Sequence, residues 1–171
     1  MNRNWILFLA LVVAFLFSLP ALGGDTASDG LSKDLTLSEN NLLLKFITME
    51  GPYTDWKMWP GKEALYEGQK PHGVLLTTYV NDIAYKALME RPGEMPDGGI
   101  IVKENYTPDE KLAAVTVMYK EKGFDPNHND WYYLKYAPDG TVQAQGAVQS
   151  CMDCHGKAKG NDWLFTGRIG K

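Results

Sequence analysis

The residues best suited to chemistry lie near the end of the chain, in the segment QSCMDCHGK. Cys151, Cys154 and His155 have the spacing C-x-x-C-H, and the chain contains no other cysteine. Thiols at this spacing can reach the two vinyl groups on one edge of a haem, and the histidine that follows is held beneath the ring, where its imidazole can bind the iron. The spacing therefore predicts one covalent haem c, with Cys151 and Cys154 as attachment residues and His155 as an axial iron ligand.

Two other kinds of site also use paired cysteines. A redox dithiol of the thioredoxin type is expected between a strand and a helix, without an export-linked histidine. A zinc site needs a second pair of ligands, and His72 and His128 are isolated in the sequence. Haem c accounts for the motif better than either alternative.

The N-terminus predicts export, which haem c attachment requires in bacteria. Arg3 precedes an apolar run over 5–19, and small residues follow at Ala21 and Gly23. We expect a cleaved signal peptide over 1–23, a flexible tail over 24–34 and a haem domain over 35–171, in the periplasm or secreted. An uncleaved membrane anchor is the alternative. The net charge of −4 and the absence of a basic run give no sign of nucleic-acid binding.

The elements that must position the haem change in character along the chain. Apolar residues at three- and four-residue spacing predict a helix over 36–50, and 53–71 is predicted to be an aromatic loop. Further along, the patterns predict a helix over 81–90, strands over 73–80, 100–106 and 112–120, and a hairpin over 130–147. The fold class is therefore α+β, with four to five mostly antiparallel strands and flanking helices.

Strand alternation places Lys103 with Ile101 and Asn105 on one face of its strand, and Glu104 on the other. Lys103 is then either half buried or a solvated lysine on an edge strand. The last strand leads directly into the cysteine motif, so some of its side chains must lie near the haem. Gln143 and Gln145 are predicted to share one face of it.

The motif lies so late that the second haem face must be covered from upstream. Small electron-transfer cytochromes carry the motif early, and four-helix cytochromes c-prime lack strands. A sixth protein ligand would make the protein an electron carrier, and four upstream side chains are candidates for that position: His72, His128, Met95 and Met118.

In order along the chain, TTYVNDIAYKAL, GEMPDGGIIVKE, DWYYLKY and CMDCH resemble the cytochrome P-460 family and the related cytochromes c-prime-beta. The resemblance covers about 72–165. It implies a twisted antiparallel sheet with helices, a homodimer and five-coordinate iron. By motif, Lys103 would be the lysine joined covalently to the haem in P-460 members. Gln145 or Gln143 would stand over the open iron position.

The resemblance further implies a role with small nitrogen species. P-460 members oxidise hydroxylamine or bind nitric oxide, and pass electrons to a redox partner protein. The c-prime-beta members only bind gases. We therefore expect an exported mono-haem cytochrome whose sixth position is open or weakly held, and the alternatives are a gas-binding protein and a six-coordinate electron carrier. Glutamine cannot act as a general base as a carboxylate does, which weighs against efficient hydroxylamine oxidation.

Overall fold

The structure is a computed structural model that describes residues 42–171. The predicted signal peptide (1–23), the predicted tail (24–34) and the start of the helix predicted over 36–50 lie outside the described residues. The end of that helix is present, because residues 42–45 are α-helical and continue into η1 (Phe46–Glu50). Within residues 42–171, no helix is long and apolar enough to cross a membrane.

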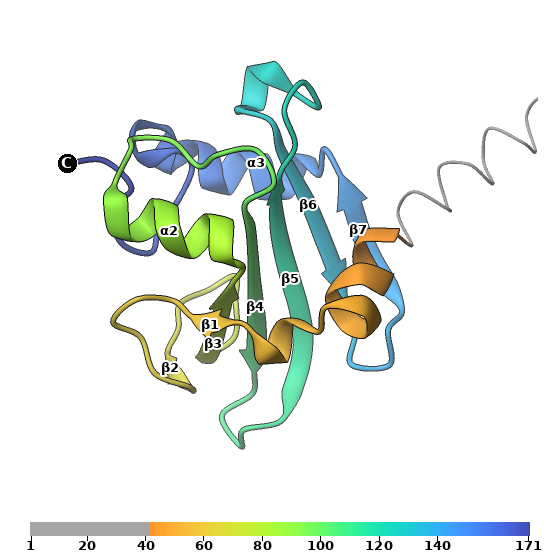
Figure 1. The fold of residues 1–171 in the computed structure, drawn as a ribbon. Helices are drawn as coiled ribbons and strands as arrows, with labels where there is room; N and C mark the ends of the chain where they lie inside the picture. The colour runs from red at the N-terminus through yellow and green to blue at the C-terminus, as the bar shows by residue number, and fades with distance from the viewer. Residues whose placement is uncertain (1–41) are drawn as a thin grey trace, which may run out of the picture. The chain divides into compact units, whose positions relative to one another are not determined.

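One antiparallel sheet forms the centre of this part of the chain (Figure 1). Its strand order is β1-β3-β4-β5-β6-β7, and β2 pairs with β3 beside β1. The strands are β1 (Lys57–Met58), β2 (Tyr66–Glu67), β3 (Leu75–Val80), β4 (Ile100–Tyr106), β5 (Leu112–Lys120), β6 (Trp131–Tyr136) and β7 (Val142–Gly146).

Both faces of the sheet are buried, because alternate residues of each strand are apolar on either side. We call them the α3 face and the N-terminal face. On the α3 face, Ile101, Met118 and Tyr133 pack against the helices and the C-terminal segment. On the N-terminal face, Val102 and Val117 pack with Ile47 of η1.

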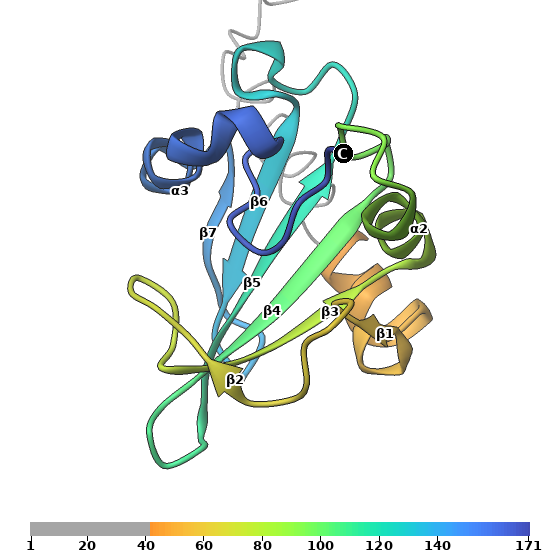
Figure 2. The same ribbon diagram turned by 90° about the vertical axis from the view of Figure 1, so that its left-hand side faces the viewer.

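The helices divide between these faces. Figure 1 shows α2 (Asp82–Glu90) and α3 (Gln149–His155) on one side of the sheet and the segment that contains η1 and η2 (Tyr53–Asp55) on the other. Figure 2 looks onto the α3 face, where the C-terminal segment passes in front of the strands. The remaining helical turns are η3 (Pro126–His128) and η4 (Gly156–Asn161). Asn81 caps α2, because its side chain accepts a hydrogen bond from the N–H of Ala84.

The predicted α+β class is confirmed. Five strands of five residues or more match those predicted from sequence, and the sheet also includes β1 and β2, which lie in the segment predicted to be a loop. Each has only two residues, which is too short for period-two alternation to be read from sequence. Their pairing with β3 fixes the segment 57–67 along the edge of the sheet.

Candidate haem site

Helix α3 presents the predicted attachment residues to the α3 face of the sheet. Cys151 and Cys154 are one helical turn apart, so their thiols lie on the same side of the helix. Both are free thiols and partly buried. The imidazole of His155 lies beside the rings of Tyr133 and Phe165, each with its centroid 5.6 Å away.

A backbone carbonyl fixes the tautomer of His155. Nδ1 of His155 lies 2.8 Å from the carbonyl oxygen of Trp163. Because a carbonyl can only accept, Nδ1 carries the proton and Nε2 keeps its lone pair. Burial, followed by the charge of Lys103, lowers the pKa of His155 and favours this neutral form. Histidines that bind metals are commonly oriented in this way by an acceptor at the other ring nitrogen.

The turn that supplies this carbonyl is strained. Asp162 and Trp163 have φ values of 53° and 64°, in the left-handed region that non-glycine residues rarely adopt. Asp162 is locked in place because its carboxylate accepts from the N–H of Met95 at 2.6 Å and from Nζ of Lys120 at 3.0 Å. These contacts offset the cost of the strained backbone, and the turn they fix holds the Trp163 carbonyl toward His155.

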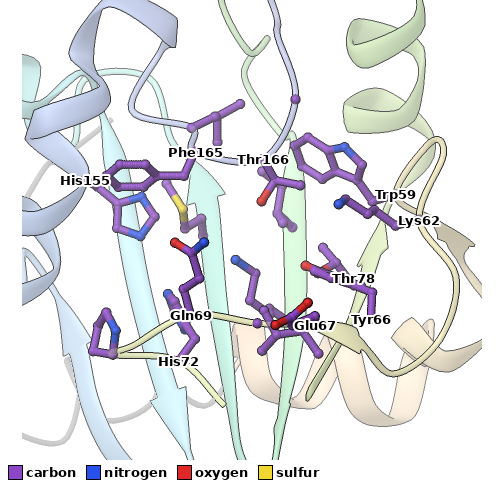
Figure 3. Close-up of a pocket in the computed structure, with 18 of the residues that line it drawn as sticks. Trp59, Lys62, Tyr66, Glu67, Gln69, His72, Thr78, His155, Phe165 and Thr166 are labelled. Atoms are coloured by element: carbon purple, nitrogen blue, oxygen red, sulfur yellow. The ribbon is translucent and has the colours of Figure 1, made fainter. Parts of the chain in front are cut away.

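A cavity of about 360 Å³ lies next to His155, between the α3 face, the segment 59–72 and the C-terminal segment. In Figure 3, His155 and Phe165 are on one side, Gln69 and His72 lie below them, and Trp59, Lys62, Tyr66 and Thr78 lie across the space. A smaller cavity of about 70 Å³ continues toward Cys151. Five lining residues are shared by both cavities: His72, Ile101, Lys103, Met118 and His155. A bound haem and any small molecule on its iron would both occupy these two joined cavities.

Lys103 lies on the same face of β4 as Ile101, as predicted. Burial lowers the pKa of its ammonium group to about 8. Among the described residues, no carboxylate forms an ion pair with it. A lysine in this state is neutral in about a tenth of the molecules at pH 7, far more than an exposed lysine, which makes its amine a potential nucleophile or ligand. The alternative of a solvated edge lysine does not apply, because β4 lies between β3 and β5.

His72 is the upstream histidine that the fold brings to this site. Its ring centroid lies 6.3 Å from that of His155, with the two planes at 80°. Nδ1 of His72 lies 2.9 Å from Oδ1 of Asn105. Burial, followed by the charge of Lys103, lowers the pKa of His72 to about 4 and keeps the ring neutral.

The residues present fit a haem. Tyr133 lies beside His155, and its hydroxyl group is buried without a hydrogen-bond partner among residues 42–171, as expected where a bound group supplies the missing partner. Lys62 and Lys70 line the main cavity and can balance the negative charge of haem propionates. The thiols, the oriented imidazole and the enclosed cavity are therefore mutually compatible with haem c.

The structure does not bring Gln143 and Gln145 to the site. Gln145 pairs with Leu134, which packs on the N-terminal face, and directly paired residues share a face. On the α3 face the neighbouring pair is Lys135 and Ala144. Gln143 is exposed beside an irregularity in the β6–β7 register. Neither glutamine lines either cavity. The expectation that one of them stands over the iron position is therefore not supported, because the strand register places Gln145 on the N-terminal face.

The other candidate sixth ligands separate in the same way. Met118 lines both cavities from β5, whereas Met95 is buried beneath the C-terminal segment. His128 hydrogen-bonds to Asp125 at 2.7 Å and lines neither of these two cavities. Of the two candidate histidines, His72 is the one whose ring contacts that of His155.

Sequence reasoning missed the wall formed by the segment 59–69. It contributes Trp59, Tyr66 and Glu67, and Glu67 is the only carboxylate among the described residues that line the main cavity. No local motif marks these residues. Their position follows from the pairing of β1 and β2 with β3, and only proline and glycine punctuation was visible in the sequence.

The site has a cysteine pair and a histidine on a short helix, and this helix packs over an antiparallel sheet beside a cavity. Together these features define a c-type haem protein with an α+β fold. A family model gives the particular assignment: the chain belongs to the cytochrome P460 family, whose model matches residues 52–166. The match includes the segment 52–71, which the motifs alone did not place. Comparison with curated proteins gives no match. Family membership confirms the haem c cofactor.

Proposed function

We propose that this cytochrome binds small nitrogen species, hydroxylamine or nitric oxide, on the iron face opposite His155, and that it oxidises hydroxylamine. The observation that supports this function is the 360 Å³ cavity beside His155, which is lined by the basic side chain of Lys103 and by the acidic side chain of Glu67.

Each side chain has a separate role in the proposal. Bound haem supplies an iron site for the nitrogen atom and accepts one electron at a time. Oxidation of one hydroxylamine to nitric oxide releases three electrons and three protons. Glu67 accepts protons within the cavity, a task that the glutamines of β7 cannot perform. A redox partner protein removes the electrons.

In this proposal, Lys103 contacts the haem edge. Its amine lines both cavities, and its pKa of about 8 provides the neutral form that bonding to carbon requires. We include in the proposal the covalent lysine–haem bond of P-460 members, in which the Lys103 nitrogen would replace a hydrogen on a carbon of the haem edge, with two protons released and two electrons passed to an oxidant of the peroxide class. Export by a cleaved signal peptide and assembly as a homodimer complete the proposed setting.

The decisive experiment combines spectra with turnover. Purified holoprotein should bind nitric oxide and should reduce an artificial electron acceptor in the presence of hydroxylamine. Glu67→Gln should lower the turnover rate about 100-fold and leave nitric oxide binding intact. Glu63→Gln, an exposed glutamate on the same segment that does not line the cavity, is the matched control and should behave like the parent protein.

The outcomes separate the proposed activities. Binding of nitric oxide without hydroxylamine turnover would remove the enzymatic part and leave a gas-binding cytochrome. An iron that binds neither molecule would refute the whole proposal. For Lys103, a ferrous Soret band shifted to longer wavelength in the parent protein and restored to an ordinary haem c position in Lys103→Arg would support the covalent bond. Identical spectra would exclude it.

A further inference from the structure

The loop that carries His72 is held rigidly against the sheet. The N–H of Gly68 donates to the carbonyl oxygen of Val74 at 2.8 Å, and the N–H of His72 donates to that of Gln69 at 3.1 Å. Gly73 lies so close to β4 that an added Cβ would come within 2.5 Å of the backbone nitrogen of Tyr106. The position of His72 is therefore built into the fold, as expected for a preorganised ligand.

Hydrogen bonds fix the tautomer of His72 as firmly as that of His155. The amide of Asn105 is oriented because its Nδ2 donates to the carbonyl oxygens of Lys103 and Ala114. Its Oδ1 therefore faces His72 and can only accept, so Nδ1 of His72 carries the proton. The free lone pair of His72 is then on Nε2, as it is in His155.

The separation of the two rings matches that of two ligands on one metal ion. An imidazole nitrogen lies about 2 Å from a first-row metal, and opposite imidazoles on one ion consequently have centroids about 6 Å apart. The observed separation is 6.3 Å. A histidine that instead hydrogen-bonded to a molecule on the iron would lie farther away, because that molecule would stand between its ring and the iron. The two ring centroids would then be about 8 Å or more apart.

We propose that Nε2 of His72 binds the haem iron opposite His155 in the resting protein, and that a nitrogen ligand enters by displacing it. The inference deepens the proposed function, on which its second half rests, because His72 then controls access to the same iron face. His72 also lines both cavities, so it can swing from the iron into adjoining space without unfolding the loop. A Lys103 that is not bonded to the haem edge is the alternative iron ligand that the test must exclude, because Lys103 lines the same cavities.

The spin state of the iron tests the first half without any activity measurement. The resting ferric holoprotein should be low-spin by electron paramagnetic resonance, with the signature of two histidine ligands. His72→Ala should become high-spin, and added imidazole should restore the low-spin signal, which also shows that the variant is folded. His128→Ala, the matched control, should remain low-spin. Lys103→Met should also remain low-spin.

Ligand-binding kinetics test the second half. Nitric oxide binding to the parent protein should reach a rate plateau set by release of His72. His72→Ala should bind at a rate linear in concentration and at least about tenfold faster, because the competent state is no longer a minor fraction.

A high-spin parent protein, or a low-spin His72→Ala without added imidazole, would overturn the inference and leave the proposed function standing. Loss of the low-spin signal in Lys103→Met alone would also overturn it, in favour of lysine ligation. If nitric oxide failed to bind to the open iron of His72→Ala, the proposed function would be refuted. The proposal that His72 binds the iron would not be affected.

Discussion

Replacing Asp162 by asparagine tests how the fold holds the turn behind His155. The Asp162 carboxylate is 1% exposed and lies 3.0 Å from Nζ of Lys120, whose side chain is 5% exposed. Both carboxylate oxygens accept hydrogen bonds, one from the N–H of Met95 and the other from Lys120 and Asn129. An asparagine of the same shape offers only one acceptor, so its NH₂ group must face one of these donors.

The expected cost is about 3 kcal/mol of unfolding free energy. Removing one member of a buried ion pair costs about 3–5 kcal/mol, because the remaining charge loses its partner. Two features favour the lower end. Lys120 keeps a second contact with Glu94 at 3.2 Å, and burial raises the pKa of Asp162, so the native pair does not fully recover the cost of desolvating the carboxylate. In a chain of this size the loss lowers Tm by about 10 °C.

Thermal and urea unfolding of the holoprotein, followed by circular dichroism, measure this change. The matched control is Asp82→Asn, which removes an ion pair with Lys57 of similar length, 2.7 Å, at the surface, where Asp82 is 90% exposed. The control should not move the unfolding midpoint, because exposed pairs contribute little. Equal midpoints for Asp162→Asn and the control would refute the claim that this buried pair secures the turn.

Three further changes have defined outcomes. The double variant Cys151→Ala/Cys154→Ala, made together with Lys103→Arg so that the proposed lysine bond cannot retain the haem, should lose covalent haem, seen as absent haem staining on a denaturing gel, and retained staining would disprove the attachment site. Asn81→Ala should lower the unfolding free energy by about 1–2 kcal/mol through loss of the α2 cap, measured by urea titration; an unchanged midpoint would contradict the cap. Tyr53→Phe removes a buried 2.9 Å hydrogen bond to the Glu104 carboxylate, and the same titration should show a loss of about 1.5–3 kcal/mol. A neutral result would mean that Glu104 finds another donor.

The main features that the sequence predicted depend on local spacing. Cysteines three residues apart share one side of a helix whatever the rest of the chain does, so C-x-x-C-H indicated haem c directly. Alternation along β4 placed Lys103 and Glu104 on opposite faces for the same local reason. Glu104 indeed contacts Tyr53 on the N-terminal face, while Lys103 lines the cavity.

Strand register set the limit of that reasoning. A shift of one residue in pairing moves every side chain of a strand to the other face. The β6–β7 hairpin contains such an irregularity, between Lys135 and Tyr136, and it places Gln145 opposite Leu134. Alternation alone could state that the two faces of β7 differ, and it could not state which face meets the haem.

The sequence by itself determined the cofactor, the fold class and the face of β4 that bears Lys103. Only the tertiary structure decided what surrounds His155: the Trp163 carbonyl that orients its imidazole, and the carboxylate of Glu67 and the imidazole of His72 in the adjoining cavity. These groups are far from His155 in sequence or depend on a strained turn, and they meet because strand pairing brings the segment 57–80 beside the C-terminal helix. Contacts between distant segments leave no periodic pattern in the sequence, so they could not be predicted from it.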